Sequence, residues 1–264
     1  MSILISTKEL NQTLKNSEDL LLVDTRPFTE YSKGHILGAV NIDLLQFHWL
    51  DTSKTGIKQF ENQSRILLSN LGVKKGQQVV FYDNLSGMSS ARGVWLLLYF
   101  SHKKACLLDG GFQGWQKEGY PVETKTNHFS PSTFVGKPDR KILATFKEVK
   151  KSVRRKDSVI VDARTKEEFV GRHVRAARAG HIPSAINVDW EKNIEQGLFK
   201  TRAELSKLYS RIPKDSKVVT YCQGGYRAAH TFLALKILGY ENVKMYLGSW
   251  GEWGNRTELP VEIQ

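Results

Sequence analysis

The chain has 264 residues, a length that favours two domains over one or three. Apolar residues make up 40% and charged residues 25%, which excludes a disordered or fibrous protein. Lys and Arg number 39 against 27 Asp and Glu, and this net charge of +12 attracts anions of any size without indicating a fold.

The sequence does not predict a membrane partner. The first residues lack the basic region and apolar stretch of a secretory signal, and no apolar run approaches the roughly 18 residues of a membrane span. The two cysteines, Cys106 and Cys222, are too few for a disulfide framework or a cysteine-rich zinc site. We therefore expect a cytoplasmic protein without a structural metal.

Both halves of the chain predict strands that alternate with helices. Short apolar runs predict buried parallel strands at 20–23, 79–82, 159–161 and 217–221. Apolar segments too long for strands predict helices at 91–100 and 228–238. This alternation predicts an α/β fold in which parallel sheets are flanked by helices on both faces.

The two halves are copies of one unit. The sequence GHILGAVNID at 34–43 matches GHIPSAINVD at 180–189 at six of ten positions, and other matching segments keep a similar offset. Two copies are too few for a solenoid, so each must have its own core. We expect a first domain at 1–125, a linker at 126–140 that contains Pro131 and Pro138, and a second domain at 141–264.

The copies differ where their second strand ends, because Asp83 follows it in the first copy and Cys222 in the second. Open α/β sheets place their sites at the carboxyl ends of strands, so one copy has kept a nucleophile there. Gly224 and Gly225 allow the following loop to curl into a nest of N–H donors that favours a thiolate. The alternative is a buried structural cysteine before a glycine turn.

The paired copies, the two Gly-His-Ile segments and the loop after the strand resemble the two-domain rhodanese family of thiosulfate and 3-mercaptopyruvate sulfurtransferases. The resemblance covers about residues 5–262. It implies a catalytic second domain and an inactive first domain with aspartate in place of cysteine. It also implies that Cys222 is the catalytic residue and that the substrate-binding loop consists of Gln223, Gly224, Gly225, Tyr226 and Arg227.

The resemblance implies ping-pong transfer of sulfane sulfur, through a persulfide on Cys222, from a small anionic donor such as thiosulfate to cyanide or a thiol. No metal or organic cofactor is expected, because the protein sulfur carries the transferred group. Loop length argues against the related cell-cycle phosphatases. The family's sulfurtransferases have six residues from nucleophile to loop end and those phosphatases seven, and Cys222 to Arg227 is six.

Two alternatives stay open. Mercaptopyruvate enzymes of the family carry a Cys-Gly-Ser/Thr-Gly-Val-Thr loop and an arginine six residues after the aspartate of the first strand, where this chain has Glu168. Both departures count against 3-mercaptopyruvate. The family's animal thiosulfate enzymes share that arginine, so this chain lacks the usual clamp for a carboxylate or sulfonate. Arg227 either replaces it as a bidentate donor to oxyanions or forms a salt bridge to Glu168 or Asp162. The other class of function is a non-catalytic persulfide carrier or redox sensor.

Two groups of cations have both a functional and a structural interpretation. The stretch between Arg164 and Gly180 is twice as long as its counterpart in the first copy, and its cations form either a collar that attracts a dianion or a solvated loop. These cationic residues are Arg172, His173, Arg175 and Arg178. A predicted helix carries six more, Lys147, Lys150, Lys151, Arg154, Arg155 and Lys156. Without interleaved aromatic residues, these favour a solvated face over nucleic-acid binding.

Residues that recur in both copies are expected to serve the scaffold rather than catalysis. These are Asp24 and Arg26 with Asp162 and Arg164, and His35 with His181. Cys106 lies in the apolar run Ala105-Cys106-Leu107-Leu108, which predicts a strand, so we expect it to be a small core residue.

Overall fold

The computed structural model describes residues 2–16 and 19–263, and it contains two compact units. The first unit comprises residues through Phe47, Glu61–Asp139 and Ile194–Phe199. The second unit comprises His48–Phe60, Arg140–Asn193 and the residues from Lys200 on. Each unit therefore includes one short segment from the other half of the sequence, which the repeat alone does not predict.

The first half of the chain forms a five-stranded sheet in the order β1-β6-β5-β2-β4, with every neighbouring pair parallel. A separate antiparallel pair joins β3 and β7. The elements are β1 (Leu4–Ile5), α1 (Thr7–Asn16), β2 (Leu20–Asp24), α2 (Phe28–Tyr31), β3 (His35–Ile36), β4 (Val40–Asn41), η1 (Leu44–Gln46), α3 (Lys54–Asn70), β5 (Gln78–Tyr82), α4 (Met88–Tyr99), β6 (Ala105–Leu108), α5 (Gly111–Lys117) and β7 (Val122–Glu123).

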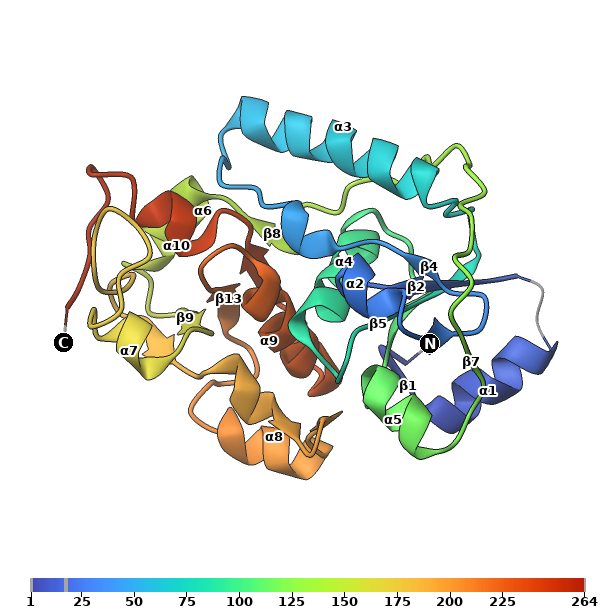
Figure 1. Cartoon of the computed structure of the whole chain (residues 1–264). Helices are drawn as coiled ribbons and strands as arrows, with labels where there is room; N and C mark the ends of the chain where they lie inside the picture. The colour runs from blue at the N-terminus through green and yellow to red at the C-terminus, as the bar shows by residue number, and fades with distance from the viewer. Residues whose placement is uncertain (1, 17–18, 264) are drawn as a thin grey trace. The chain divides into compact units, whose positions relative to one another are not determined.

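Both faces of this first sheet are covered, because successive side chains of a strand point to opposite sides. On one face, Val80 and Tyr82 of β5 share a core with Leu10 of α1 and Trp115 of α5. On the other face, the Phe81 ring lies so close to α4 that a side chain at Gly93 would collide with it. Figure 1 shows these helices around the strands.

The second half forms another five-stranded parallel sheet, in the order β10-β9-β13-β14-β8. An antiparallel pair, β11 with β12, lies in the segment that belongs to the first unit. The elements are β8 (Leu143–Ala144), α6 (Phe146–Ser152), β9 (Ser158–Asp162), α7 (Lys166–Phe169), β10 (Ile186–Asn187), η2 (Trp190–Asn193), β11 (Ile194–Glu195), β12 (Leu198–Phe199), α8 (Arg202–Leu208), β13 (Lys217–Tyr221), α9 (Tyr226–Ile237), β14 (Val243–Tyr246) and α10 (Ser249–Trp253).

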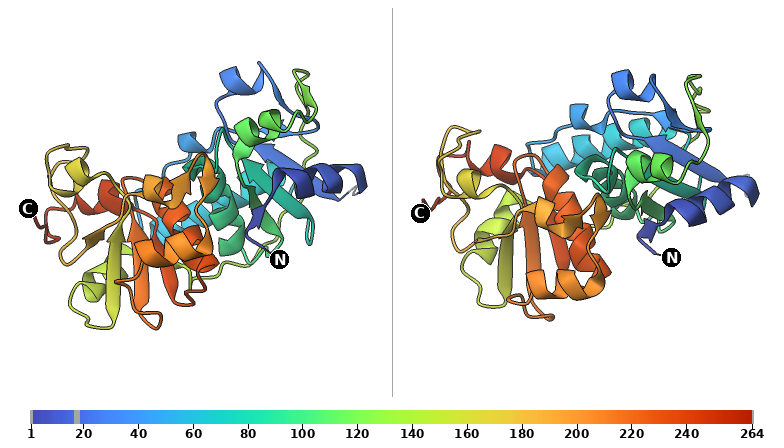
Figure 2. Two further views of the ribbon diagram at one scale, coloured as in Figure 1. Left: turned by 90° about the horizontal axis from the view of Figure 1, so that it is seen from below. Right: turned by 60° about the horizontal axis from the view of Figure 1, so that its bottom comes forward.

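Helices also cover both faces of the second sheet. Tyr221 of β13 packs on one face with Trp250 of α10 and Val149 of α6. The neighbouring Thr220 points the other way, and its hydroxyl donates to the Ala228 carbonyl of α9 at 3.0 Å. Figure 2 shows the strands of this unit, yellow-green to red, with helices on both sides. The predicted α/β fold with two flanked parallel sheets is confirmed.

The predicted strands are present, but three helix boundaries differ. Helices α4 and α9 begin at Met88 and Tyr226, earlier than predicted, because polar residues in their first turns interrupt the apolar pattern. The predicted basic helix ends at Ser152, so Arg154, Arg155 and Lys156 lie in the following turn.

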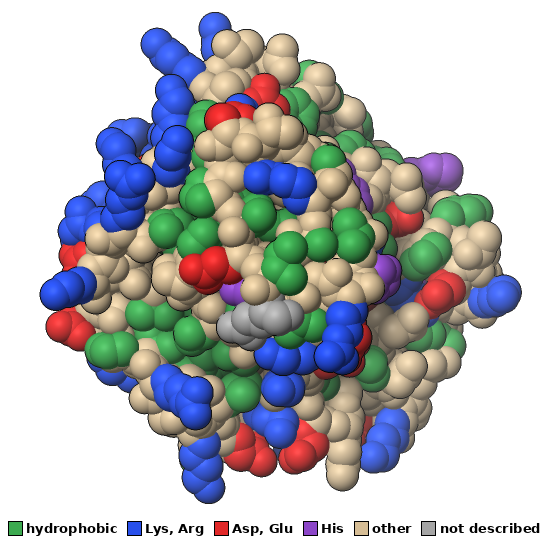
Figure 3. Space-filling model, turned by 90° about the vertical axis from the view of Figure 1, so that its left-hand side faces the viewer, with side chains coloured by type: hydrophobic (Ala, Val, Ile, Leu, Met, Phe, Trp, Pro, Cys, Tyr) green, Lys and Arg blue, Asp and Glu red, His purple; other side chains and the backbone are tan. Residues whose placement is uncertain are grey.

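Figure 3 shows Lys and Arg side chains gathered along the upper left edge of one face of the molecule. No helix in the described ranges is long and apolar enough to cross a membrane.

The residues that recur in both copies form the same buried contacts in each. Arg26 pairs with Asp24, and Arg164 with Asp162, with shortest distances of 2.6 Å in both units. His35 and His181 each direct Nδ1 to a backbone carbonyl and stack on an aromatic ring. These ion pairs and hydrogen bonds join segments within each unit, which agrees with the predicted role of these residues in the scaffold.

The segment predicted as the linker packs along the first unit. The Asn127 side chain donates to the Ala39 carbonyl at 3.0 Å, the Ser132 hydroxyl donates to the Val73 carbonyl at 2.7 Å, and the Phe134 N–H donates to the Ser69 hydroxyl at 3.0 Å. Residues up to Asp139 accordingly belong to that unit.

Candidate active site

Cys222 lies directly after β13, at the carboxyl end of a central strand of the second sheet. Its Sγ accepts a hydrogen bond from the Gly225 N–H at 3.1 Å. Gly225 has a φ of 91° and is the residue before α9, so the chain turns back over the sulfur before the helix begins. The residue is only 1% exposed, which restricts access to small reagents.

The start of helix α10 holds the backbone of the cysteine loop. The Trp250 N–H donates to the Cys222 carbonyl at 2.9 Å, and the Gly251 N–H donates to the Gln223 carbonyl at 2.8 Å. The Cys222 N–H donates to the Ser249 hydroxyl at 3.2 Å. These three bonds fix the loop to the segment after β14.

Gly224 and Gly225 serve the loop for different reasons. At Gly225 the left-handed backbone itself favours glycine. At Gly224 a side chain would lie 2.6 Å from the imidazole of His48, whose ring also lies 5.0 Å from the ring of Tyr226. His48 belongs to the segment of the first half that joins the second unit, and no sequence signal connected it with the loop.

The structure places Tyr226 and Arg227 in the first turn of α9 rather than in the loop. Helix α9 begins there because left-handed Gly225 precedes it and its backbone carbonyl accepts a hydrogen bond from the Ala229 N–H. The Gln223 side chain is bound to the basic segment, since its Nε2 donates to the Arg175 carbonyl at 2.9 Å. The loop side chains therefore hold neighbouring segments, and the backbone N–H of Gly225 faces the sulfur.

Arg227 forms a bidentate ion pair with Glu168, with N–O distances of 2.5 and 2.9 Å. Burial alone would raise the pKa of Glu168, but the guanidinium of Arg227 lowers it to about 2. Burial opposes the charge of Arg227 as well, yet the hydrogen bond to Glu168 and the nearby Cys222 sulfur raise its pKa above the ordinary value. Of the two roles left open for Arg227, the structure contains the salt bridge to Glu168.

The long basic segment is anchored by Arg178. Its guanidinium donates to the backbone carbonyls of Trp253, Gly254, Arg256 and Leu259. Arg178 is therefore partly buried and held by these carbonyls, and the choice between a collar and a solvated loop stays a prediction. Arg172, His173 and Arg175 are exposed, and Arg175 lies 3.7 Å from Glu168.

At the equivalent strand end, the first unit has a longer loop that begins with a carboxylate. Asp83 accepts hydrogen bonds from the N–H groups of Gly87, Ser89 and Ser90 at 3.0 to 3.3 Å. Burial raises the pKa of Asp83 to about 6, although the hydrogen bonds from these N–H groups act in the opposite direction. At neutral pH the loop of this copy thus surrounds a carboxylate, whereas the loop of the other copy surrounds a sulfur.

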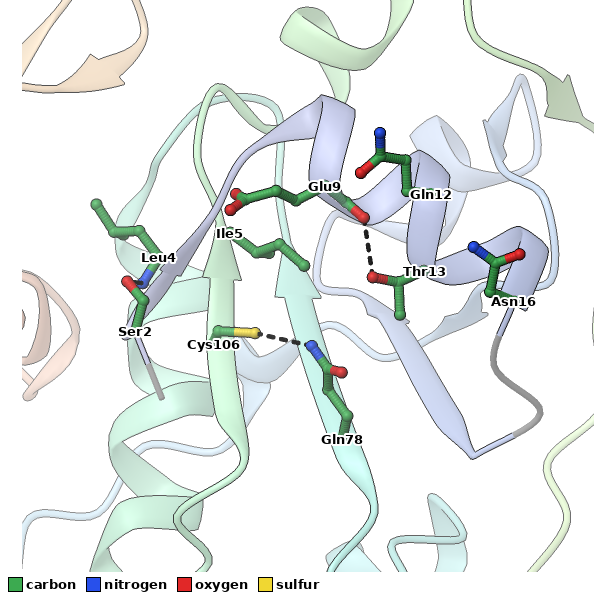
Figure 4. Close-up of a pocket in the computed structure, with 9 residues that line it drawn as sticks. All are labelled: Ser2, Leu4, Ile5, Glu9, Gln12, Thr13, Asn16, Gln78 and Cys106. Atoms are coloured by element: carbon green, nitrogen blue, oxygen red, sulfur yellow. Dashed lines mark hydrogen bonds between the residues drawn. The ribbon is translucent and has the colours of Figure 1, made fainter.

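Cys106 lies in β6, and its sulfur is buried beside a hollow between β1, α1 and β5 (Figure 4). Its Sγ is 3.9 Å from the Gln78 side chain, and burial raises the pKa of the thiol to about 11. This confirms Cys106 as a small core residue that stays protonated at neutral pH. Within the described ranges no group of three or more His, Cys, Asp or Glu side chains could hold a metal ion.

Fold and site together define a duplicated α/β protein in which one copy presents a cysteine, and the other an aspartate, at the carboxyl edge of a parallel sheet. A family model described as "Rhodanese-like domain" matches residues 6–118 and 145–256. The chain belongs to this rhodanese-like family.

Relatives along nearly the whole chain have names that refer to sulfur. A thiosulfate sulfurtransferase of Pseudomonas aeruginosa is 31% identical over 93% of this chain and 92% of its own. One of Corynebacterium glutamicum with the same name is 34% identical over 95% of this chain and 84% of its own. The sulfur carrier protein TtuD of Thermus thermophilus is 33% identical over 98% of this chain and 96% of its own.

Solved structures confirm the fold at lower identity. An anaerobic ergothioneine biosynthesis enzyme from Chlorobium limicola superposes with a TM-score of 0.87 at 19% identity, covering 99% of this chain and 70% of that one. The structure of YnjE gives a TM-score of 0.83 at 22% identity, covering 99% of this chain and 68% of that one.

Proposed function

We propose that this protein is a sulfurtransferase that moves sulfane sulfur from thiosulfate to cyanide or a thiol through a persulfide on Cys222. The observation that carries the proposal is the hydrogen bond from the Gly225 N–H to the Cys222 sulfur at 3.1 Å. The corresponding loop of the other copy holds a carboxylate, which supports a loop suited to negative charge. The names of the relatives support the same class of reaction.

In the first half-reaction, the Cys222 thiolate attacks the outer sulfur of thiosulfate. A bond forms between Sγ and that sulfur, the S–S bond of thiosulfate breaks, and its electron pair leaves with sulfite. The product is a persulfide whose terminal sulfur carries the negative charge. In the second half-reaction, cyanide or a thiolate attacks the terminal sulfur, and the Sγ–S electron pair returns to Cys222 as thiolate.

The loop contributes mainly through its backbone in this proposal. The N–H of Gly225 stabilises the anionic sulfur, and left-handed Gly225 turns the chain over the sulfur before α9 begins. Arg227 supplies positive charge beside the loop while it is held by Glu168. Gln223 fixes the loop to the segment of Arg175, the exposed cation nearest this ion pair.

The test is the intact mass of the purified protein after thiosulfate treatment, followed by peptide mapping. We expect a gain of one sulfur atom on the peptide that contains Cys222, and loss of this sulfur on addition of cyanide. The matched variants are C222S, which should take up no sulfur, and C106S, which should behave as the unmodified protein. Sulfur on the Cys106 peptide, or full uptake by C222S, would refute the assignment.

A non-catalytic sulfur carrier is the second candidate, because one relative is named as a sulfur carrier protein. A carrier and an enzyme differ in turnover. Repeated cycles with thiosulfate and cyanide indicate an enzyme, whereas a single loading that only another protein can discharge indicates a carrier. A steady-state comparison with 3-mercaptopyruvate tests the donor, and a marked preference for it would overturn the choice of thiosulfate.

A further inference from the structure

Ser249 has a backbone conformation that a residue with a side chain rarely adopts. Its φ is +51°, in the left-handed region, and the residue is fully buried. Such a conformation is unfavourable for serine and persists only where the surroundings enforce it. It lies at the start of α10, where the backbone holds the cysteine loop.

The first copy has glycine at the equivalent position. Gly111 has a φ of +57°. The two residues after it, Phe112 and Gln113, donate their N–H groups to the carbonyls of Asp83 and Asn84 at 2.8 and 3.0 Å. In the second copy, Trp250 and Gly251 make the equivalent bonds to Cys222 and Gln223. Both copies thus have a left-handed residue here, although the residues before it, Gly110 and Gly248, differ in φ (86° and −71°). Glycine meets this requirement without a side chain.

The first copy could not use serine here, because a side chain at Gly111 would lie 2.5 Å from the carbonyl oxygens of Asp83 and Leu85. The loop after Cys222 is shorter than the loop after Asp83, and the second copy accommodates a hydroxymethyl group at this position. The copy that contains Cys222 therefore has a serine in the unfavourable left-handed conformation, where the other copy has glycine.

The Ser249 hydroxyl bridges the cysteine to the neighbouring strand. It accepts the hydrogen bond of the Cys222 N–H at 3.2 Å and donates its own proton to the Tyr246 carbonyl at 2.9 Å. Both partners are buried, so the hydroxyl supplies an acceptor that water does not. The Cys222 peptide group is thereby held from its N–H side by Ser249 and from its carbonyl side by Trp250.

We propose that Ser249 is a positioning residue for Cys222, whose hydroxyl orients the Cys222 peptide so that the sulfur faces the Gly225 N–H. The proposal rests on the proposed function in so far as the positioned sulfur is the nucleophile. In this proposal Ser249 does not contact the sulfur donor or the sulfur acceptor of the reaction. Its loss should reduce the reactivity of the sulfur rather than the binding of thiosulfate.

The central variant is S249G, which gives the second copy the residue of the first and relieves the left-handed strain while it removes the hydroxyl. We expect it to fold, and we expect the rate of Cys222 alkylation by iodoacetamide to fall about tenfold, as the loss of one buried hydrogen-bond partner implies. The maximal rate of persulfide formation should fall by a similar factor, with the KM for thiosulfate within about twofold of the original.

Two further variants keep the test decisive. S249A retains the left-handed side chain without the hydroxyl, so it should lose reactivity as S249G does even if its stability differs. T25A removes another buried hydroxyl, whose proton goes to the Tyr82 carbonyl at 2.9 Å, and introduces the residue that the second copy has as Ala163. It should leave Cys222 reactivity unchanged, which separates positioning from general loss of buried hydrogen bonds.

Alkylation and persulfide rates within twofold of the original in both S249G and S249A would overturn the proposal. An equal loss of reactivity in T25A would also overturn it, because the effect would then be general. Failure of the unmodified protein to form a persulfide would count against the proposed function alone, since alkylation of Cys222 by a neutral reagent still reports whether Ser249 positions the sulfur.

Discussion

The ion pair between Arg227 and Glu168 determines the charge beside the cysteine loop. Both side chains are largely buried, and the two charges cancel when both groups are ionised. Arg175 approaches the same carboxylate at 3.7 Å but is half exposed, so this group of three side chains has a net positive charge. Arg227, predicted to belong to the substrate-binding loop, is thus paired with a neighbouring carboxylate.

This ion pair predicts a pH dependence of stability. The folded pKa of Glu168 is about 2, below the value of 4.5 for a free side chain, so its ionisation stabilises the folded state above about pH 5. The stabilisation is lost as the pH falls from about 5 towards 2. At neutral pH the free energy of unfolding should be about 3 kcal/mol larger in the original protein than in E168Q, as the size of the pKa shift implies.

Urea denaturation of both proteins at a series of pH values measures this difference. Because other carboxylates titrate in both proteins, only the difference between the two curves reports on Glu168. We expect it to shrink steadily below pH 5. A difference that stays constant down to pH 3 would show that Glu168 stabilises the protein without its charge.

At the scale of elements, the two copies place different chemical groups at equivalent strand ends. In the first copy, the Gly87 N–H before α4 and the Ser89 and Ser90 N–H groups in its first turn donate to the Asp83 carboxylate. In the second copy, the Gly225 N–H before α9 donates to the Cys222 sulfur. The second loop owes its tightness to Gly225 at the left-handed position before α9.

Replacement of each of the two loop glycines by alanine should lower the free energy of unfolding by different amounts. G225A forces alanine into the left-handed region, which should lower the free energy of unfolding by about 1–2 kcal/mol. G224A meets only the exposed ring of His48, which can move aside, so the loss should stay within about 0.5 kcal/mol. Thermal or urea unfolding of both variants measures the contrast. Equal losses would mean that contact with His48, and not backbone conformation, limits the loop.

The sequence predicted elements better than it predicted contacts between them. Apolar runs located β2, β5, β9 and β13, and comparison of the copies identified Cys222, because both signals lie in local sequence. Periodicity says nothing of tertiary partners, and so His48, Ser249 and the carbonyls around Arg178 were missed. For Ser249 a signal did exist: it stands opposite Gly111 in the aligned copies, the same kind of difference that identified Cys222.

At the scale of the whole molecule, the excess of Lys and Arg side chains gives a positive net charge that attracts small anions. The net charge is +12, and Figure 3 shows a face on which Lys and Arg outnumber Asp and Glu. Glu168 cancels the charge of Arg227, whereas Arg178 is bound only to carbonyls and its charge adds to the field around the protein. Such a field raises the rate at which anions arrive, without any specific contact.

The reaction with thiosulfate should therefore depend on salt. Between about 0.01 M and about 0.1 M sodium chloride the Debye length falls from about 30 to about 10 Å, so the attraction of a dianion to the protein weakens. We expect kcat/KM for thiosulfate to fall several-fold over this range. Alkylation of Cys222 by iodoacetamide, which is uncharged, should stay constant because no field steers it. If both rates fell in parallel, salt would be acting on the sulfur or its loop, and if neither fell, the positive charge would have no part in donor capture.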